Sequence, residues 1–296
     1  KNLIYLFIFI VIISLDFLKQ YFTGINFIGL KPSFCNYTTG ECQRFSGFFG
    51  SELVFGGYFS TIIISLFILF KIFYQNNWIN LFPFIILIII FLSGERSAFL
   101  LALVFNIVFY FNIMKFNLKN MLGILFLFII SIILFNSFIK DSTKSRYYND
   151  LKKLIIPDQP NIIETLKLTP WGLHYNAGVL MVLENPVFGN GYKSFRVKCK
   201  NYETEEIRKA QESDRQYQLK NYKVCSTHPH NFHLELAIDT GLIGYSIFLL
   251  FVFYLLKELY SLKIEKKFLL KIIFYFIIIF IFLPRPTGSI FTTFFG

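Results

Sequence analysis

Long apolar runs separated by short polar segments dominate the hydropathy pattern of this chain. Runs that approach the length of a membrane span occupy residues 3–18, 48–70, 79–92, 98–114, 121–139, 234–256 and 268–283, and a further run begins at Ile290. About 20 apolar residues in a helix cross the roughly 30 Å of bilayer hydrocarbon. The pattern therefore predicts an all-α integral membrane protein, a polytopic helical bundle of about seven spans. Since the chain starts and stops beside apolar runs, we expect it to be a truncated piece, and no cleavable signal peptide can be assigned in it.

The polar segments predict three regions and an orientation. Residues 1–139 would form N-terminal transmembrane helices with short outer loops, residues 140–233 one large outer loop, and residues 234–296 the C-terminal transmembrane helices. The lysines of the short loops fall on a single face if successive spans alternate in direction; they are Lys71, Lys115, Lys119, Lys257, Lys263, Lys266 and Lys267. Positively charged short loops mark the cytoplasmic face.

Composition supports a membrane protein over a nucleic-acid-binding one. Of the 296 residues, 55% are hydrophobic, and a soluble domain could not bury that much apolar surface. The net charge of +11 is explained by orientation in the bilayer, so we predict no nucleic-acid partner.

The four cysteines lie in two polar segments of the outer face. Cys35 and Cys42 share one loop, and Cys199 and Cys225 share the long loop. The pairing favours two local disulfides in an oxidising compartment, with four separate thiols as the alternative. Neither spacing resembles a zinc site.

Three of the four histidines lie within six residues at the outer mouth of a predicted span: His228, His230 and His233. An imidazole there suits a base that titrates near neutrality, and a helix N-terminus suits a phosphate. The alternatives are a cluster that only caps the helix and, less favoured because of the intervening proline, a zinc site. Asn231 is expected mainly to cap the helix, and Gly241 and Gly244 to allow close packing.

Several motifs together resemble the O-antigen ligase and O-antigen polymerase superfamily of bacterial membrane proteins. His230-Asn231 is followed at the family's spacing by Gly241 and Gly244. Three further segments occur in the family's order: Arg-Phe-Ser-Gly at 44–47, Ser-Gly-Glu-Arg at 93–96 with Leu100, and Asn-Pro-Val-Phe-Gly-Asn-Gly at 185–191 with Phe195. The likeness covers residues 44–244. Family members commonly have about a dozen spans, so several would be missing here.

The resemblance implies a glycosyltransferase at the periplasmic face of the bacterial inner membrane. Its donor would be a glycan on undecaprenyl pyrophosphate, and its acceptor lipid A-core, as in lipopolysaccharide biosynthesis. His230 and Arg96 would be catalytic, with His230 deprotonating the acceptor. Arg44, Arg96, Arg146 and Asn231 would bind the donor pyrophosphate at one periplasmic mouth, without metal or cofactor, and displacement would be inverting. For Arg96 and Arg44 the alternative is a headgroup anchor, with Glu95 neutralising Arg96.

Other functions remain open at this level. A polysaccharide polymerase, with a growing glycan as acceptor, and a protein O-oligosaccharyltransferase would share the donor site. A transporter is disfavoured because charged groups gather at the ends of the predicted spans rather than in their middles. Asp239 is the main exception, and we expect it to pair with Arg285 or another outer basic group.

Overall fold

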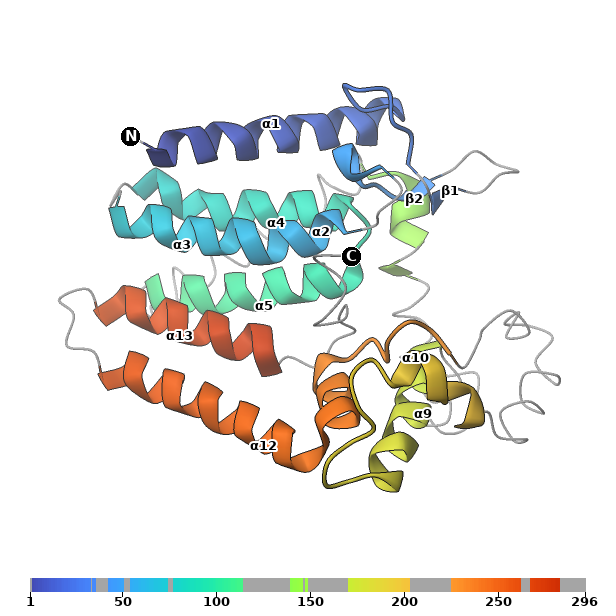
Figure 1. Ribbon diagram of the computed structural model, residues 1–296. Helices are drawn as coiled ribbons and strands as arrows, with labels where there is room; N and C mark the ends of the chain where they lie inside the picture. The colour runs from blue at the N-terminus through green and yellow to red at the C-terminus, as the bar shows by residue number, and fades with distance from the viewer. Residues whose placement is uncertain are drawn as a thin grey trace. The chain divides into compact units, whose positions relative to one another are not determined.

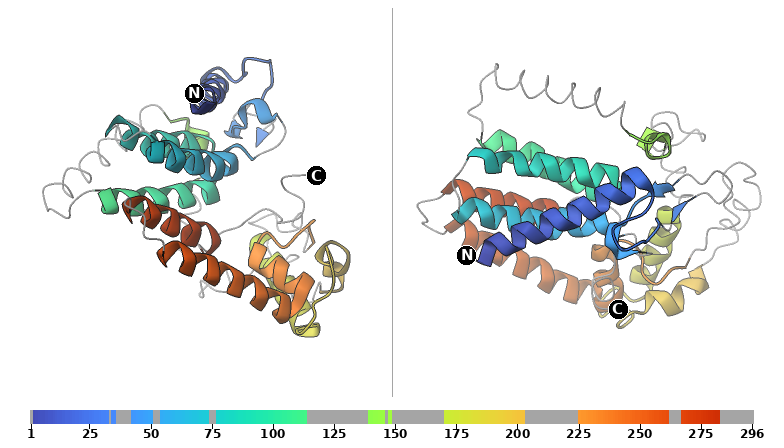
Figure 2. Two further views of the ribbon diagram at one scale, coloured as in Figure 1. Left: turned by 60° about the vertical axis from the view of Figure 1, so that its left-hand side comes forward. Right: turned by 90° about the horizontal axis from the view of Figure 1, so that it is seen from above.

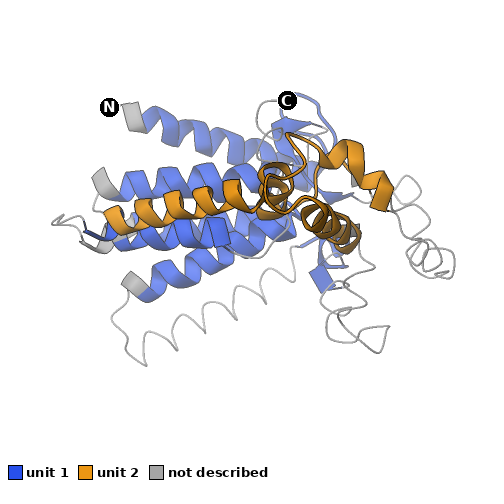
Figure 3. Cartoon of the chain, turned by 60° about the horizontal axis from the view of Figure 1, so that its bottom comes forward, with its two compact units in different colours: residues 1–151, 259–283 blue, residues 152–258, 284–296 orange. Residues whose placement is uncertain are grey.

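A computed structural model describes most of the chain as helices. The described residues are 2–32, 34–35, 42–50, 54–73, 77–113, 139–145, 147–148, 170–202, 225–261 and 267–282. They divide into two compact units, residues 1–151 with 259–283 and residues 152–258 with 284–296 (Figure 3). The predicted span at 121–139 and the side chains of Arg146 and Arg285 lie outside this description.

The first unit is a layered bundle of apolar helices. Its elements are α1 (Asn2–Thr23), α2 (Phe55–Tyr58), η2 (Phe59–Ile63), α3 (Ile64–Phe73), η3 (Asn77–Leu81), α4 (Phe82–Leu92), α5 (Arg96–Ile113) and α13 (Lys267–Phe282). α4 packs on α5, and α13 packs on both α5 and α3, so the last helix returns to the N-terminal ones (Figures 1 and 2).

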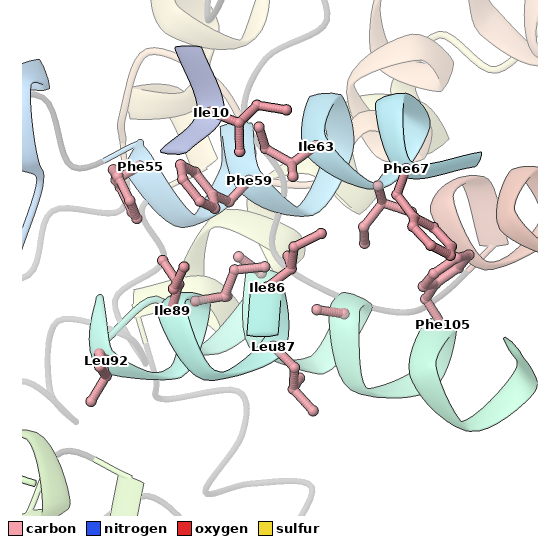
Figure 4. Packing of buried hydrophobic residues seen from close by; sticks show 14 of the residues in the cluster. Ile10, Phe55, Phe59, Ile63, Phe67, Ile86, Leu87, Ile89, Leu92 and Phe105 are labelled. Atoms are coloured by element: carbon pink, nitrogen blue, oxygen red, sulfur yellow. The ribbon is translucent and has the colours of Figure 1, made fainter. Parts of the chain in front are cut away.

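Aromatic side chains fill the spaces between these helices. Phe17 of α1 stacks on Phe55 at a centroid distance of 4.1 Å, and Phe55 stacks on Phe59 at 4.3 Å. Figure 4 shows the Phe67 and Phe105 rings facing each other, to the right of Ile86 and Leu87. Such ring pairs add to the apolar burial that holds helices together. Other faces of these helices are exposed. On α1, for example, the Tyr5 side chain is 69% exposed. A helix that is apolar on its exposed face fits a lipid environment.

Among the described residues, two helices are long and apolar enough to cross a bilayer, Ile4–Thr23 and Phe232–Ser261. Shorter apolar helices at Phe55–Lys71, Ile79–Leu92, Arg96–Phe111 and Lys271–Phe282 coincide with four further predicted runs. The predicted run at 48–70 begins too early, because residues 47–49 form a separate turn, η1 (Gly47–Phe49), and Gly47 and Gly50 both have positive φ. The helical membrane character is thus supported, whereas the number of spans stays a prediction.

A short hairpin and a smaller helical unit complete the description. Strands β1 (Phe34–Cys35) and β2 (Cys42–Arg44) pair antiparallel in the first unit. The second unit contains α9 (Pro170–Glu184), α10 (Phe195–Lys198), η4 (Cys199–Tyr202) and α12 (Phe232–Ser261). Its small core joins α9, α10 and the first turns of α12 through Leu173, Ala177, Met181, Phe195, Cys199 and Ile238 (Figure 1).

Candidate functional site

α12 is broken at Gly241, whose φ of 67° and ψ of −174° are not helical. The break leaves a short segment at 232–240 and a 20-residue segment at 242–261, which at 1.5 Å per residue is about 30 Å long. The second segment by itself therefore matches the bilayer thickness. Asp239, which the sequence pattern placed two turns inside a span, precedes this segment.

The loop at 185–191 supplies the hydrogen bonds that the broken helix loses. The Asn190 N–H donates to the Ile238 carbonyl at 2.7 Å, and the Gly191 N–H to the Asp239 carbonyl at 3.1 Å. On the other side of the break, the Leu242 N–H donates to the Pro186 carbonyl at 2.7 Å. The loop thus satisfies backbone groups at the end of one helical segment and the start of the next.

Glycines permit this close approach of two backbones. A Cβ at position 241 would lie 2.2 Å from the Val187 carbonyl oxygen, and one at 189 would lie 2.4 Å from the Gly241 nitrogen. At Gly244 a Cβ would meet the Thr240 side chain at 2.4 Å. Both Gly241 and Gly189 also have positive φ, which side chains other than glycine rarely adopt.

Asp239 fixes the segment that follows the loop. Its carboxylate accepts the backbone N–H of Lys193 at 2.8 Å, the backbone N–H of Ser194 at 3.3 Å and the Ser194 hydroxyl at 3.1 Å. The partner expected from the sequence, Arg285, lies outside the described residues. These three donors satisfy the Asp239 carboxylate and give it a role in positioning residues 193 and 194. Its presence in the helix therefore does not require a transport function.

The rings of three histidines lie close together: His228 and His230, which precede α12, and His174 of α9. The His230 ring centroid lies 4.1 Å from that of His228 and 5.3 Å from that of His174. The indole of Trp171 meets the His230 ring edge to face at 4.6 Å. His230 itself has a φ of 55°, a left-handed conformation that is uncommon outside glycine. The histidine at the centre of this group is therefore held in a specific backbone conformation.

One face of α9 forms the wall beside His230. Trp171, His174 and Tyr175 are spaced i, i+3, i+4, which places them on the same side of a helix. The Tyr175 hydroxyl donates to the His230 carbonyl at 3.4 Å, and His174 is only 6% exposed. The sequence pattern had not indicated His174, because it lies 54 to 59 positions before the other three. One signal in the sequence could have indicated it: His174 follows Trp171 by three positions, so both side chains lie on the same face of a helix.

Burial, and then the neighbouring His228 and His174, lower the pKa of His230 from 6.5 to about 3. The imidazole is therefore neutral at physiological pH and has a nitrogen lone pair that can accept a proton, and its pKa lies below the near-neutral value expected from the sequence. A hydroxyl placed at this nitrogen could be deprotonated as it attacks a substrate.

The remaining residues of the histidine segment have other partners. The His233 Nδ1 lies 3.2 Å from the Tyr245 hydroxyl, while the Asn231 Oδ1 accepts the Leu234 N–H at 3.0 Å and so caps α12. Within the described residues, no three His, Cys, Asp or Glu side chains are placed to hold a metal ion.

Both pairs of cysteines are joined in the structure. A disulfide links Cys35 to Cys42 across the β1–β2 hairpin, and another links Cys199 to Cys225. The second bond ties η4 to the segment that begins three residues before His228. It therefore restricts the path of the chain into the histidine group.

In the first unit, two of the predicted arginines lie together at the turn between α4 and α5. The Phe45 N–H donates to the Ser93 carbonyl at 3.1 Å, which holds the segment of Arg44 against this turn. The Arg44 Nη2 lies 3.9 Å from the Glu95 Oε2, so Glu95 lies beside Arg44. The charges of Arg44 and Arg96 are close enough to repel one another.

Glu95 is held by backbone donors at the start of α2. Its carboxylate accepts the N–H of Gly56 at 2.7 Å and of Gly57 at 3.2 Å. A Cβ at Gly56 would lie 2.8 Å from the Glu95 side chain, so the fit requires glycine. Burial lowers the pKa of Arg44, and the Glu95 carboxylate opposes that lowering.

Two half-buried guanidinium groups lie near each other at this turn, and the Arg44 guanidinium is paired with the Glu95 carboxylate. Guanidinium groups can bind an anionic ligand such as a phosphate through two parallel hydrogen bonds. Arg146 lies outside the described residues, but its neighbour Tyr147 stacks on Phe91 at 4.5 Å and donates its hydroxyl to the Phe91 carbonyl at 3.1 Å.

Comparison with known proteins agrees with the motifs. The family model described as O-antigen ligase matches residues 81–249, more than half of the chain. No curated protein and no solved structure matches it. The matched region includes Arg96, the loop at 185–191, the histidine group and both glycines of α12. With its apolar helices and this match, the chain is a membrane protein that belongs to the O-antigen ligase family.

Proposed function

We propose that this protein transfers a glycan from undecaprenyl pyrophosphate to an acceptor hydroxyl at the periplasmic face of the bacterial inner membrane. Membership of the family implies a glycosyltransferase of the O-antigen ligase or polymerase type. The observation that carries the finer proposal is the neutral imidazole of His230, held beside Trp171 and His174 at the start of α12. The favoured acceptor is lipid A-core.

The proposed reaction is a metal-independent, inverting displacement. The acceptor hydroxyl gives its proton to His230 while its oxygen forms a bond to the anomeric carbon of the donor sugar. The bond from that carbon to the pyrophosphate oxygen breaks, and undecaprenyl pyrophosphate leaves with the electron pair. Arg44, Arg96 and Arg146 would bind the pyrophosphate and stabilise its developing charge. Asn231 would contribute by keeping the first turn of α12 in place.

Deletion of the gene, followed by separation of surface glycans and glycoproteins, tests this function. Loss of all glycan-capped lipid A-core with retention of lipid-linked polymer is the expected result for a ligase. Capping by single repeat units would indicate a polymerase instead. An unchanged glycan ladder with lost glycoprotein would indicate a protein O-oligosaccharyltransferase. Unchanged glycans of every kind would contradict the proposal altogether.

His174 gives a sharper prediction for the proposed base. Replacing His174 with Gln removes a neighbour that lowers the pKa of His230, so that pKa should rise. The acid side of the pH–rate profile should then move to higher pH, because His230 is active only when unprotonated. The measurement is kcat/KM for transfer from about pH 2.5 to about pH 6, a range that includes the pKa of His230, about 3.

A matched control for this variant is His233→Gln, since His233 contacts Tyr245 rather than His230. This control should leave the acid limb where it is. If His174→Gln lowered only the amount of folded protein and left the profile unmoved, His174 would be structural alone.

A further inference from the structure

Part of the second unit presents apolar side chains to its surroundings outside the predicted spans. We call these side chains the loop surface. They are Val179 and Leu183 of α9 and Val187, Phe188 and Tyr192 of the following loop. Phe188 is 79% exposed and Leu183 is 68% exposed. Exposed apolar groups gathered in this way mark a surface that contacts lipid or another apolar partner.

Backbone hydrogen bonds tie the loop surface to the start of the membrane-spanning part of α12. The Leu242 N–H donates to the Pro186 carbonyl at 2.7 Å, and the Ile243 N–H to the Val187 carbonyl at 3.3 Å. Leu242 is itself 51% exposed, and it begins the 20-residue segment that matches the bilayer thickness. Val187 is therefore held beside the first residues of that segment.

Basic side chains follow the apolar ones directly. The segment 185–198 contains Lys193, Arg196 and Lys198 and has no Asp or Glu. The Lys193 Nζ lies 5.1 Å from the centroid of the Tyr192 ring, and the Lys198 Nζ donates to the Asn190 Oδ1 at 3.0 Å. Apolar residues with an adjacent cationic rim are typical of elements that lie in a membrane interface and contact anionic headgroups.

We propose that the loop surface inserts into the nearer leaflet of the bilayer that α12 crosses. Val187 and Phe188 would enter the acyl region, while Lys193, Arg196 and Lys198 would contact lipid phosphates. The occupant is bilayer lipid rather than a second protein, because the surface continues directly into that of a membrane span. This inference rests on the membrane character of α12 and does not require the proposed reaction.

Fluorescence quenching by brominated lipid tests the insertion. The two natural tryptophans, Trp78 and Trp171, are first replaced with Phe, and Phe188→Trp is added as a reporter in the full chain. Two calibrating variants carry the tryptophan elsewhere: Phe253→Trp on the exposed face of the α12 span, and Asn201→Trp at an exposed polar site in η4. Each protein is reconstituted in vesicles of anionic and zwitterionic phospholipids with brominated acyl chains.

The Phe188→Trp reporter should lose emission to nearly the extent of Phe253→Trp, and much more than Asn201→Trp. Quenching no greater than at position 201 would overturn the proposal, whether water or a second copy covers the loop. In vesicles without anionic lipid, quenching at 188 should fall, and replacing Lys193, Arg196 and Lys198 with Gln should reproduce that fall. Equal quenching in both lipid mixtures would contradict the proposed contact of Lys193, Arg196 and Lys198 with lipid phosphates.

Discussion

Replacing His230 with Asn should reduce glycan transfer about 10²- to 10⁴-fold, the range over which a positioned general base contributes to a rate. Asn is the informative substitution because the φ of 55° at this position suits Asn better than Ala. The variant should therefore keep its fold while losing the proton acceptor. The measurement is kcat with purified, reconstituted full-length protein, lipid-linked donor and acceptor.

His233→Asn serves as the matched control, since it removes an imidazole three residues away that contacts Tyr245 instead. It should retain most of the activity. Near-normal transfer by the His230→Asn protein, inserted to the same level as the unaltered one, would rule out the assigned role. Because the pKa of His230 is about 3, protonation of this group should not lower kcat/KM of the unaltered protein near pH 6.5.

Arg96→Gln should produce the second large loss, about 10²- to 10³-fold in kcat, which corresponds to about 3–4 kcal/mol of transition-state stabilisation. Gln cannot compensate the charge that develops on the leaving pyrophosphate. Arg96→Lys should restore part of the activity because it keeps the positive charge but loses the two-pronged geometry of guanidinium. The assay is the same reconstituted transfer reaction, with donor concentration varied to separate kcat from KM.

Lys257→Gln controls for the loss of one positive charge, since Lys257 is exposed near the end of α12. Its kinetics should match those of the unaltered protein. Full activity of Arg96→Gln would leave Arg96 as a headgroup anchor only. Combining Arg96→Gln with His230→Asn gives a further check, because groups that act in one chemical step show strongly non-additive losses.

The motifs and the local elements could be read from the sequence. Apolar runs predicted α1, α4, α5, α12 and α13, because a helix in lipid satisfies its backbone hydrogen bonds within its own segment. Residues 121–138 of a further predicted run lie outside the described residues. Asn231 lies at the start of a run, and its side chain caps that helix through a neighbour three residues away. Cys35 and Cys42 are seven positions apart and meet across a hairpin. Such features involve partners that are close in the chain, so a pattern is enough to suggest them.

Partners distant in the chain could not be predicted in this way. His174 joins His230 across 56 positions, and Glu95 receives the N–H groups of Gly56 and Gly57 from another helix. The break at Gly241 is stabilised by the loop at 185–191, and only its geometry shows that Asp239 precedes the 20-residue span.

The sequence by itself thus determined that this is a helical membrane protein of the O-antigen ligase family with a histidine segment at the start of the apolar run at 234–256. Tertiary structure decided which groups surround His230, which carboxylate faces Arg44, and where α12 is broken. The physical reason is that hydropathy and capping depend on each segment alone, whereas burial and hydrogen bonding in the site depend on how segments far apart in the chain pack together.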